Sequence, residues 1–221
     1  MSASRIFWVV RHAEREDNIN SNWRKNANPH KLKSDNSPLS SRGHEQAKEL
    51  AKRFSNVRID HIFASPFERT VETATAIANE RKIPIKLEPG LCEALYMCEE
   101  PPSFEDANEL KKRFPLVDTS YKSIYNKPMP KEGMGDSACV ARLQKTIDGI
   151  CERYEDAESI VLVSHASPIG AIHEVLVNEW NYVGQATVTK FVETEKGSKQ
   201  FRLEYSSNAD HLSNKSNLRP Y

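Results

Sequence analysis

Five residues that could bind or attack a phosphoryl group stand at or near points where apolar segments of the sequence end. They are Arg11, His12, Arg15, Arg69 and His165. A guanidinium group matches two phosphate oxygens at once and stays charged at every relevant pH, and an imidazole can serve as nucleophile or hydrogen-bond donor. The set predicts a pocket for a small phosphorylated molecule, provided that the fold brings the five side chains together.

The apolar segments themselves predict buried strands. Ile6–Val10 and Ile160–Val163 are continuous apolar runs, and each is followed within two residues by a histidine. Further strands are predicted at 60–64, 85–87, 186–192 and 201–205, and helices after Ser40 or Ser41, after Ser65, from about 136 and from 168. This alternation predicts an α/β fold: a three-layer sandwich with a mostly parallel central sheet and helices on both faces. Ligands bind beyond the carboxyl ends of strands in such sheets, which is where the five residues stand.

Two helix starts have specific signals. The segment Ser65-Pro66-Phe67-Glu68 predicts a capping box with Ser65 as the cap, and it places Arg69 in the first turn. A cation there opposes the helix dipole, so we expect a bound anion beside it. The segment 95–135 holds five of the twelve prolines and is expected to be an excursion with one helix, capped by Ser103.

Length and composition predict a single domain. The chain has 221 residues, enough for one sizeable core and short for two. We expect residues 1–205 to form this domain, with the excursion at about 95–135, and residues 206–221 to form a polar, mobile tail.

Charge, hydropathy and cysteine content limit the partners, cellular location and cofactors that we expect. Lys plus Arg and Asp plus Glu are both 31, so the zero net charge predicts no nucleic-acid partner. No apolar run approaches the roughly 20 residues of a membrane span, and the N-terminal one is too short and early for a signal peptide, which favours a cytoplasmic protein without membrane attachment. The four cysteines have neither C-x-x-C nor zinc-like spacing, so we expect reduced thiols, no metal and no cofactor.

Four segments, in this order, resemble the signature of the histidine phosphatase (phosphoglycerate mutase-like) superfamily. Residues 11–15 resemble R-H-G-x-R, residues 39–47 resemble L-[ST]-x-x-G-x-x-Q-A, residues 65–74 resemble S-P-x-x-R-[TC]-x-x-T-A, and residues 163–166 resemble the second-histidine motif. With the surrounding elements, the resemblance covers residues 5 to about 175. Ala13 departs from the usual Gly, although its backbone carbonyl can still hold His12.

Shorter matches indicate which members of the superfamily the chain resembles most. The segments R-H-x-E-R-x-D at 11–17 and E-P-G-L-C-E at 88–93 are similar to the phosphatase domain of ubiquitin-associated and SH3-domain-containing proteins and to insect ecdysteroid-phosphate phosphatase. The chain has no room for the ubiquitin-binding and SH3 modules of the former.

The resemblance implies a metal-independent phosphomonoester hydrolase that passes through a phosphohistidine intermediate. His12 would be the nucleophile, with its other ring nitrogen donating to a carbonyl. The three arginines and His165 would hold the equatorial oxygens of the phosphoryl group. Glu93 would protonate the leaving alcohol and later activate water, for which partial burial must raise its pKa.

Other glutamates could be the general acid. Glu88, Glu99 and Glu100 lie near Glu93 in the sequence and stay open as the general acid. Glu14 is interpreted as a loop or supporting residue instead.

Two other functions fit the same residues. One is a phosphoglycerate-type mutase, and the other is a scaffold that binds a phosphorylated ligand with little turnover. The expected substrate is a phosphorylated small molecule or a phosphopeptide, selected by residues 95–135 as a roof over the pocket. A homodimer is an open alternative to a monomer.

Overall fold

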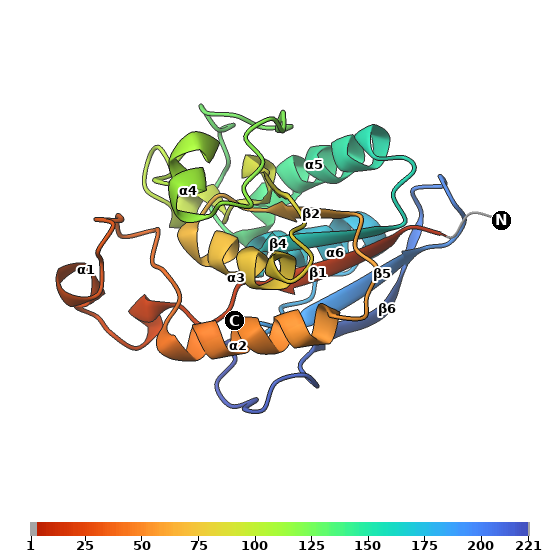
Figure 1. Ribbon diagram of the computed structural model, residues 1–221. Helices are drawn as coiled ribbons and strands as arrows, with labels where there is room; N and C mark the ends of the chain where they lie inside the picture. Colours follow the sequence, from red (N-terminus) through yellow and green to blue (C-terminus); the bar gives the residue numbers. More distant parts are fainter. Residues whose placement is uncertain (1–3, 221) are drawn as a thin grey trace.

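Six strands form one sheet in the order β3-β2-β4-β1-β5-β6 in the computed structural model, which describes residues 4–220 (Figure 1). Their bounds are β1 Ile6–Arg11, β2 His61–Ala64, β3 Ile85–Leu87, β4 Ser159–Ser164, β5 Val188–Glu193 and β6 Phe201–Asn208. Strands β1 to β4 are mutually parallel, whereas β5 runs antiparallel to β1 and β6 antiparallel to β5. The predicted mostly parallel sheet is confirmed.

Strand β1 shows why the central strands are apolar on both faces. Trp8 and Val10 point into one hydrophobic cluster, and Phe7 and Val9 point into the other. All four side chains are buried because helices cover the sheet on both sides.

Two long helices cover each face of the sheet (Figure 1). α2 (Ser41–Phe54) and α3 (Glu68–Asn79) pack on one face, and α5 (Val140–Arg153) and α6 (Ala166–Val177) pack on the other. The shorter helices are α1 (Trp23–Asn26) and α4 (Ala107–Arg113), and 3₁₀ turns occur at Glu16–Asn18, Pro89–Leu91, Leu95–Met97 and Asp136–Cys139. The predicted three-layer sandwich is confirmed.

The start of α3 differs from the predicted capping box. Ser65 does not cap this helix: α3 begins at Glu68, after Phe67 in an extended conformation. The backbone N–H of Glu68 donates instead to the side-chain oxygen of Asn36 at 2.7 Å. A cap from 32 positions earlier in the chain leaves no local pattern, and it frees the Ser65 hydroxyl for another partner.

The proline-rich excursion also begins its helix elsewhere than predicted. Asp106, not Ser103, caps α4 and accepts from two backbone N–H groups, because the Ser103 hydroxyl is bonded to Asp35 instead. Farther along, Val117 forms an isolated bridge with Ile85, so the excursion lies along the β3 edge of the sheet.

The expected mobile tail is packed against the domain. Residue 205 falls inside β6, and Leu212 beyond it is only 3% exposed. Leu218 also packs on the hydrophobic cluster beneath α2 and α3. These two leucines give an otherwise polar segment enough apolar surface to hold it in place.

The Gly43 position provides a test of how α2 meets the loop after β1. A Cβ atom added there would lie 2.1 Å from the carbonyl oxygen of Glu14, and the Gly43 N–H donates to the capping hydroxyl of Ser40. We expect Gly43→Ala to lower the free energy of unfolding by about 1–3 kcal/mol in urea titrations, despite the better helix propensity of alanine. Gly133→Ala, where the nearest atom would be 4.0 Å away, is the control, and equal stability of the two variants would contradict the close approach.

Candidate active site

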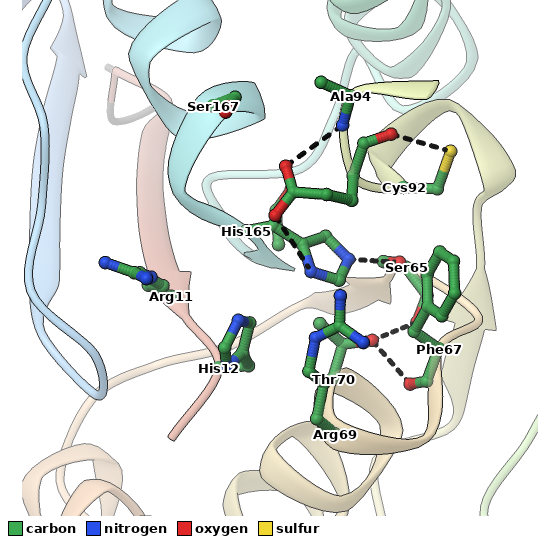
Figure 2. Close-up of polar contacts among 12 residues, drawn as sticks. Arg11, His12, Ser65, Phe67, Arg69, Thr70, Cys92, Ala94, His165 and Ser167 are labelled. Carbon is green, nitrogen blue, oxygen red and sulfur yellow. Dashed lines mark hydrogen bonds and ion pairs between the residues drawn. The ribbon is translucent and has the colours of Figure 1, made fainter. Parts of the chain in front are cut away.

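The site forms where β1, β2 and β4 end side by side. Arg11 is paired with Ser164 in the parallel register, so the next residues, His12 and His165, become neighbours with ring centroids 5.3 Å apart. Figure 2 shows His12, Arg69 and His165 around one space, with Arg11 at its side. The fold therefore brings together residues that are more than 150 positions apart in the sequence.

His12 is held in one tautomer. Its Nδ1 lies 2.8 Å from the carbonyl oxygen of Ala13, and because a carbonyl can only accept, Nδ1 is the nitrogen that donates. The expectation that the Ala13 carbonyl can still hold the ring is confirmed. Burial, together with the charges of Arg69 and Arg11, lowers the pKa of His12 well below its ordinary value. The ring is therefore neutral, with Nε2 unprotonated.

Arg69 and Arg11 are charged groups deep in the site. Arg69 is 2% exposed, donates through Nη1 to the Asp35 carbonyl at 2.8 Å, and stacks on the ring of Phe67. Arg11 donates through Nη1 to the Val183 carbonyl at 2.7 Å. Burial lowers the pKa of each arginine to about 10, so both stay charged at neutral pH.

Several buried polar atoms of the site lack hydrogen-bond partners. The Nε atoms of Arg11 and Arg69 and the Nδ1 atom of His165 are buried with no hydrogen-bond partner in the described part of the chain. Buried polar groups are almost always satisfied in folded proteins. Unpaired Nε atoms also occur on Arg42 and Arg53, but those of Arg11 and Arg69 lie beside two histidines, where an anion could accept from them.

Arg15 is the most exposed of the predicted arginines, with 27% of its side chain accessible. Its Nε and Nη2 donate to the two carboxylate oxygens of Asp17 at 2.7 and 2.8 Å. This bidentate pair fixes the plane of the guanidinium group at the cavity wall. Sequence reasoning did not identify Asp17 as a functional residue, although the R-x-D spacing was a usable signal.

His165 lies between a hydroxyl and a carboxyl group. Its Nε2 is 2.7 Å from the hydroxyl oxygen of Ser65, the group that the predicted capping box had assigned to α3. Its Nδ1 is 3.9 Å from Oε2 of Glu93. Burial and the charge of Arg69 lower the pKa of His165 well below its ordinary value, so this contact joins a neutral ring to a carboxyl group rather than forming an ion pair.

Glu93 is the one candidate acid that the structure places beside the histidines. It is 6% exposed, and burial raises its pKa against the opposing charges of Arg69 and Arg11. Arg142 holds the loop that presents it, because its guanidinium group donates to the backbone carbonyls of residues 90, 92 and 93 at 2.8, 2.8 and 3.1 Å. Glu132 pairs with Arg142 in turn.

The alternative glutamates have other partners. Glu88 accepts from Gly90 N–H, from the Tyr121 hydroxyl and from two further backbone N–H groups. Glu99 is bonded to Ser34 on the surface, and Glu100 is exposed. Glu14 is buried against Ser40 and Arg42. None of these four carboxylates lines the cavity with His12.

The cavity that His12 lines has a volume of about 330 Å³. Its lining residues are Arg11, His12, Arg15, Asn18, Glu93, Tyr96, Met97, Asp136, Ala166, Ser167, Tyr182, Gln185 and Arg219. Only Tyr96 and Met97 come from the excursion at 95–135. At the mouth, Asp136 accepts from the hydroxyls of Tyr96, Tyr182 and Ser167 at 2.6–2.8 Å, a cluster that the sequence did not indicate.

Two features are absent from residues 4–220: a metal-binding cluster and a membrane-spanning helix. No group of three or more His, Cys, Asp or Glu side chains is arranged to hold a metal ion within that range. None of the helices there is long and apolar enough to cross a membrane.

Comparison with known proteins identifies the family. The model of the histidine phosphatase superfamily (branch 1) matches residues 7–204. The chain belongs to this superfamily. It is thus a histidine phosphatase, an enzyme class that hydrolyses phosphomonoesters through a histidine.

Relatives of this histidine phosphatase fall into several groups. It is 26% identical over 158 residues to the adenosylcobalamin/alpha-ribazole phosphatase of Escherichia coli, which covers 72% of each chain. It is 31% identical over 144 residues to human ubiquitin-associated and SH3 domain-containing protein A, covering 60% of this chain and 21% of that protein. Among solved structures, the ecdysone phosphate phosphatase from Bombix mori in complex with tungstate superposes with a TM-score of 0.69, at 21% identity and 96% coverage of both chains.

Replacing Glu93 or Glu88 with glutamine should have opposite effects on the free energy of unfolding, because the two carboxyl groups lie in different environments. Folding raises the pKa of Glu93 above the value of about 4.3 that a glutamate has in the unfolded chain. Such a group stabilises the folded state at low pH. That stabilisation is lost as the pH rises through the raised pKa. We therefore expect Glu93→Gln to match or exceed the parent in free energy of unfolding at pH 7.5, with the difference smaller at pH 5. Glu88→Gln should instead lose about 1–3 kcal/mol at both pH values, because it disturbs four accepted hydrogen bonds. Urea titrations would contradict this assignment if the two variants were equally destabilised at pH 7.5.

Proposed function

We propose that this histidine phosphatase uses Nε2 of His12 to attack the phosphorus of a phosphomonoester, without help from a metal ion. The observation that carries the proposal is the pair of buried, unpaired guanidinium donors on Arg11 and Arg69, together with His165, beside a neutral histidine of fixed tautomer. The attack forms the N–P bond as the bond to the leaving oxygen breaks. The negative charge of the transition state spreads over the equatorial oxygens, which these donors and Arg15 would hold.

Glu93 supplies the proton in this proposal. Its raised pKa keeps the carboxyl group protonated at a higher pH than an exposed glutamate, so it can donate to the departing alcohol oxygen. The resulting carboxylate then takes a proton from water, and the hydroxide attacks the phosphohistidine. Orthophosphate leaves, and His12 and the protonated Glu93 are regenerated.

Metal independence follows from the source of the positive charge. Arg11, Arg15 and Arg69 bring three guanidinium groups to one site, and these neutralise the phosphoryl group in the way that Mg²⁺ does in other phosphotransferases. We propose that no divalent cation takes part.

The substrate in this proposal is a phosphorylated small molecule rather than a phosphopeptide. A cavity of about 330 Å³ suits a compact ligand, and two of the relatives are named for small phosphorylated molecules. Tyr96, Met97 and Tyr182 are partly exposed at the cavity mouth, 39%, 52% and 44% respectively. These side chains favour an alcohol with an apolar part, while the nearby Asp136 carboxylate disfavours a second negative charge at that side.

We also infer a cytoplasmic location, supported by four cysteines that are all unpaired. Self-association into a homodimer stays a prediction, which analytical ultracentrifugation can test.

The nucleophile can be tested by trapping the intermediate. Brief incubation with a labelled aryl phosphate in EDTA should give an acid-labile, base-stable phosphoenzyme in the parent protein and none in His12→Ala, together with essentially complete loss of phosphate release. His44→Ala, which removes a half-exposed histidine from α2, is the matched control and should keep parental activity. Turnover by His12→Ala, or activity that requires added magnesium or zinc, would refute the mechanism. Transfer of phosphate to a second hydroxyl instead of water would indicate a mutase.

The role of Glu93 can be tested by the choice of leaving group. Nitrophenolate departs without a proton, whereas an alkyl alcohol needs one, and general acid catalysis typically contributes ~10²–10⁴-fold. Glu93→Gln should therefore slow alkyl phosphate hydrolysis much more than phosphoenzyme formation from nitrophenyl phosphate. Stopped-flow measurement should show a burst of nitrophenol followed by slow turnover, because the same carboxylate activates water. Equal losses on both substrates with no burst would mean that another group is the acid.

A further inference from the structure

Residues 209–220 form a strap that runs from the end of β6 past α2 (Figure 1), and Arg219 near its end lines the cavity. Leu212 is buried, and the backbone N–H of Ser213 donates to Glu49 of α2 at 3.0 Å. Arg42, also on α2, donates to the carbonyl oxygen of Ser216. The strap is therefore attached along its length rather than at one point.

Its last contacts lie beside the catalytic loops. The Leu218 carbonyl accepts from the backbone N–H of Gln185 at 2.7 Å. Leu218 also lies against Gly184, where an added Cβ atom would be 2.9 Å from the Cβ atom of Leu218. The absence of a side chain at Gly184 is what lets the strap approach so closely.

This approach places Arg219 in the wall of the cavity, with Arg11, His12 and Arg15. Its backbone carbonyl accepts from Nη1 of Arg11, so the strap helps to orient an arginine of the catalytic site. Its Nη2 donates to the Asn18 carbonyl at 3.1 Å. Its φ of 50° lies in the left-handed region, which a residue with a side chain adopts only when its surroundings hold it there.

The guanidinium group of Arg219 is only partly satisfied. Its Nε is buried and has no hydrogen-bond partner among residues 4–220, as is true of Nε in Arg11 and Arg69. The carboxylates that line the same cavity are Glu93 and Asp136. Neither carboxylate is paired with Arg219 in the described contacts: Glu93 accepts from the Ala94 N–H, and Asp136 accepts from three hydroxyls.

We propose that Arg219 is a fourth arginine that binds the anionic substrate in this cavity, through either the phosphoryl group or a second anionic group on the same molecule. The inference rests on the proposed function of the cavity. It assigns a role in substrate binding to a segment outside the four motifs that carry the family resemblance.

The variant Arg219→Ala isolates the side chain, because it keeps the backbone carbonyl that holds Arg11. Lys215→Ala is the matched control: it removes one positive charge from the same strap, where Lys215 pairs only with Asp210 in the described contacts. Phenyl phosphate carries one anionic group, and 3-phosphoglycerate adds a carboxylate. Hydrogen exchange of residues 209–220 and the melting temperature report whether the strap stays in place.

We expect Arg219→Ala to lower kcat/KM by about tenfold, the usual effect of losing one hydrogen bond to a charged group, while Lys215→Ala stays within about twofold of the parent. Loss on both substrates would assign Arg219 to the phosphoryl group, and loss on 3-phosphoglycerate alone would assign it to the second anion. Arg219→Lys should recover part of the loss, since it restores the charge.

Unchanged kinetics on both substrates with an intact strap would overturn the proposal. Equal losses in Arg219→Ala and Arg219→Lys with a released strap would also overturn it, because the role would then be structural. If the parent protein hydrolyses neither substrate, the proposed function fails separately. Arg219 is then tested by calorimetric titration of orthophosphate and 3-phosphoglycerate into the parent and Arg219→Ala, where equal affinities would reject it.

Discussion

The parallel pairing of β1 with β4 is the constraint on which the rest of the site depends. Both strands are buried on both faces, so their register is fixed by packing against two layers of helices. Because Arg11 stands opposite Ser164, the chain leaves the sheet at His12 and His165 side by side. A shift of one residue in either strand would turn its apolar side chains to the wrong faces and would separate the two histidines. Stability of the core and geometry of the site thus come from the same contacts.

The site collects positive charge on side chains with little access to solvent, because Arg11 is 8% exposed and Arg69 is 2% exposed. Burying a guanidinium group without a full set of partners is unfavourable, and Arg11 and Arg69 both leave a buried Nε unpaired. The protein tolerates this because each of the two arginines is anchored by one backbone carbonyl or more, which holds it without neutralising it. In the proposed function, a phosphoryl group supplies the missing acceptors. Burial also lowers the pKa of His12 and raises the pKa of Glu93, so one environment favours the neutral forms that the proposed nucleophile and acid require.

Residues remote in the sequence hold this arrangement. Asn36 caps α3 and so sets where Arg69 enters the site, while Arg142 grips the carbonyls of the loop that presents Glu93. Asp17 fixes the plane of Arg15, and Arg219 reaches the same cavity along the strap. These supports come from loops and a terminal strap, whereas the histidines stand on the rigid edge of the sheet. Such a division lets the reacting groups stay fixed while the surrounding loops shape the mouth of the cavity.

The sequence by itself determined the α/β sandwich, the family and the set of residues that meet at the strand ends. Apolar periodicity and short motifs are local properties of the sequence. The rule that ligands bind at the carboxyl ends of strands then predicts where in the fold the motif residues meet. Tertiary structure decided the rest. It distinguished Glu93 from Glu88, which are both buried, because Glu93 lines the cavity with His12 whereas Glu88 accepts four hydrogen bonds elsewhere. It places the Ser65 hydroxyl against His165 instead of at the start of a helix, and it brings the polar segment after β6 to the cavity. Each of these outcomes depends on contacts between residues far apart in the chain, whose free energy no local pattern of side chains encodes.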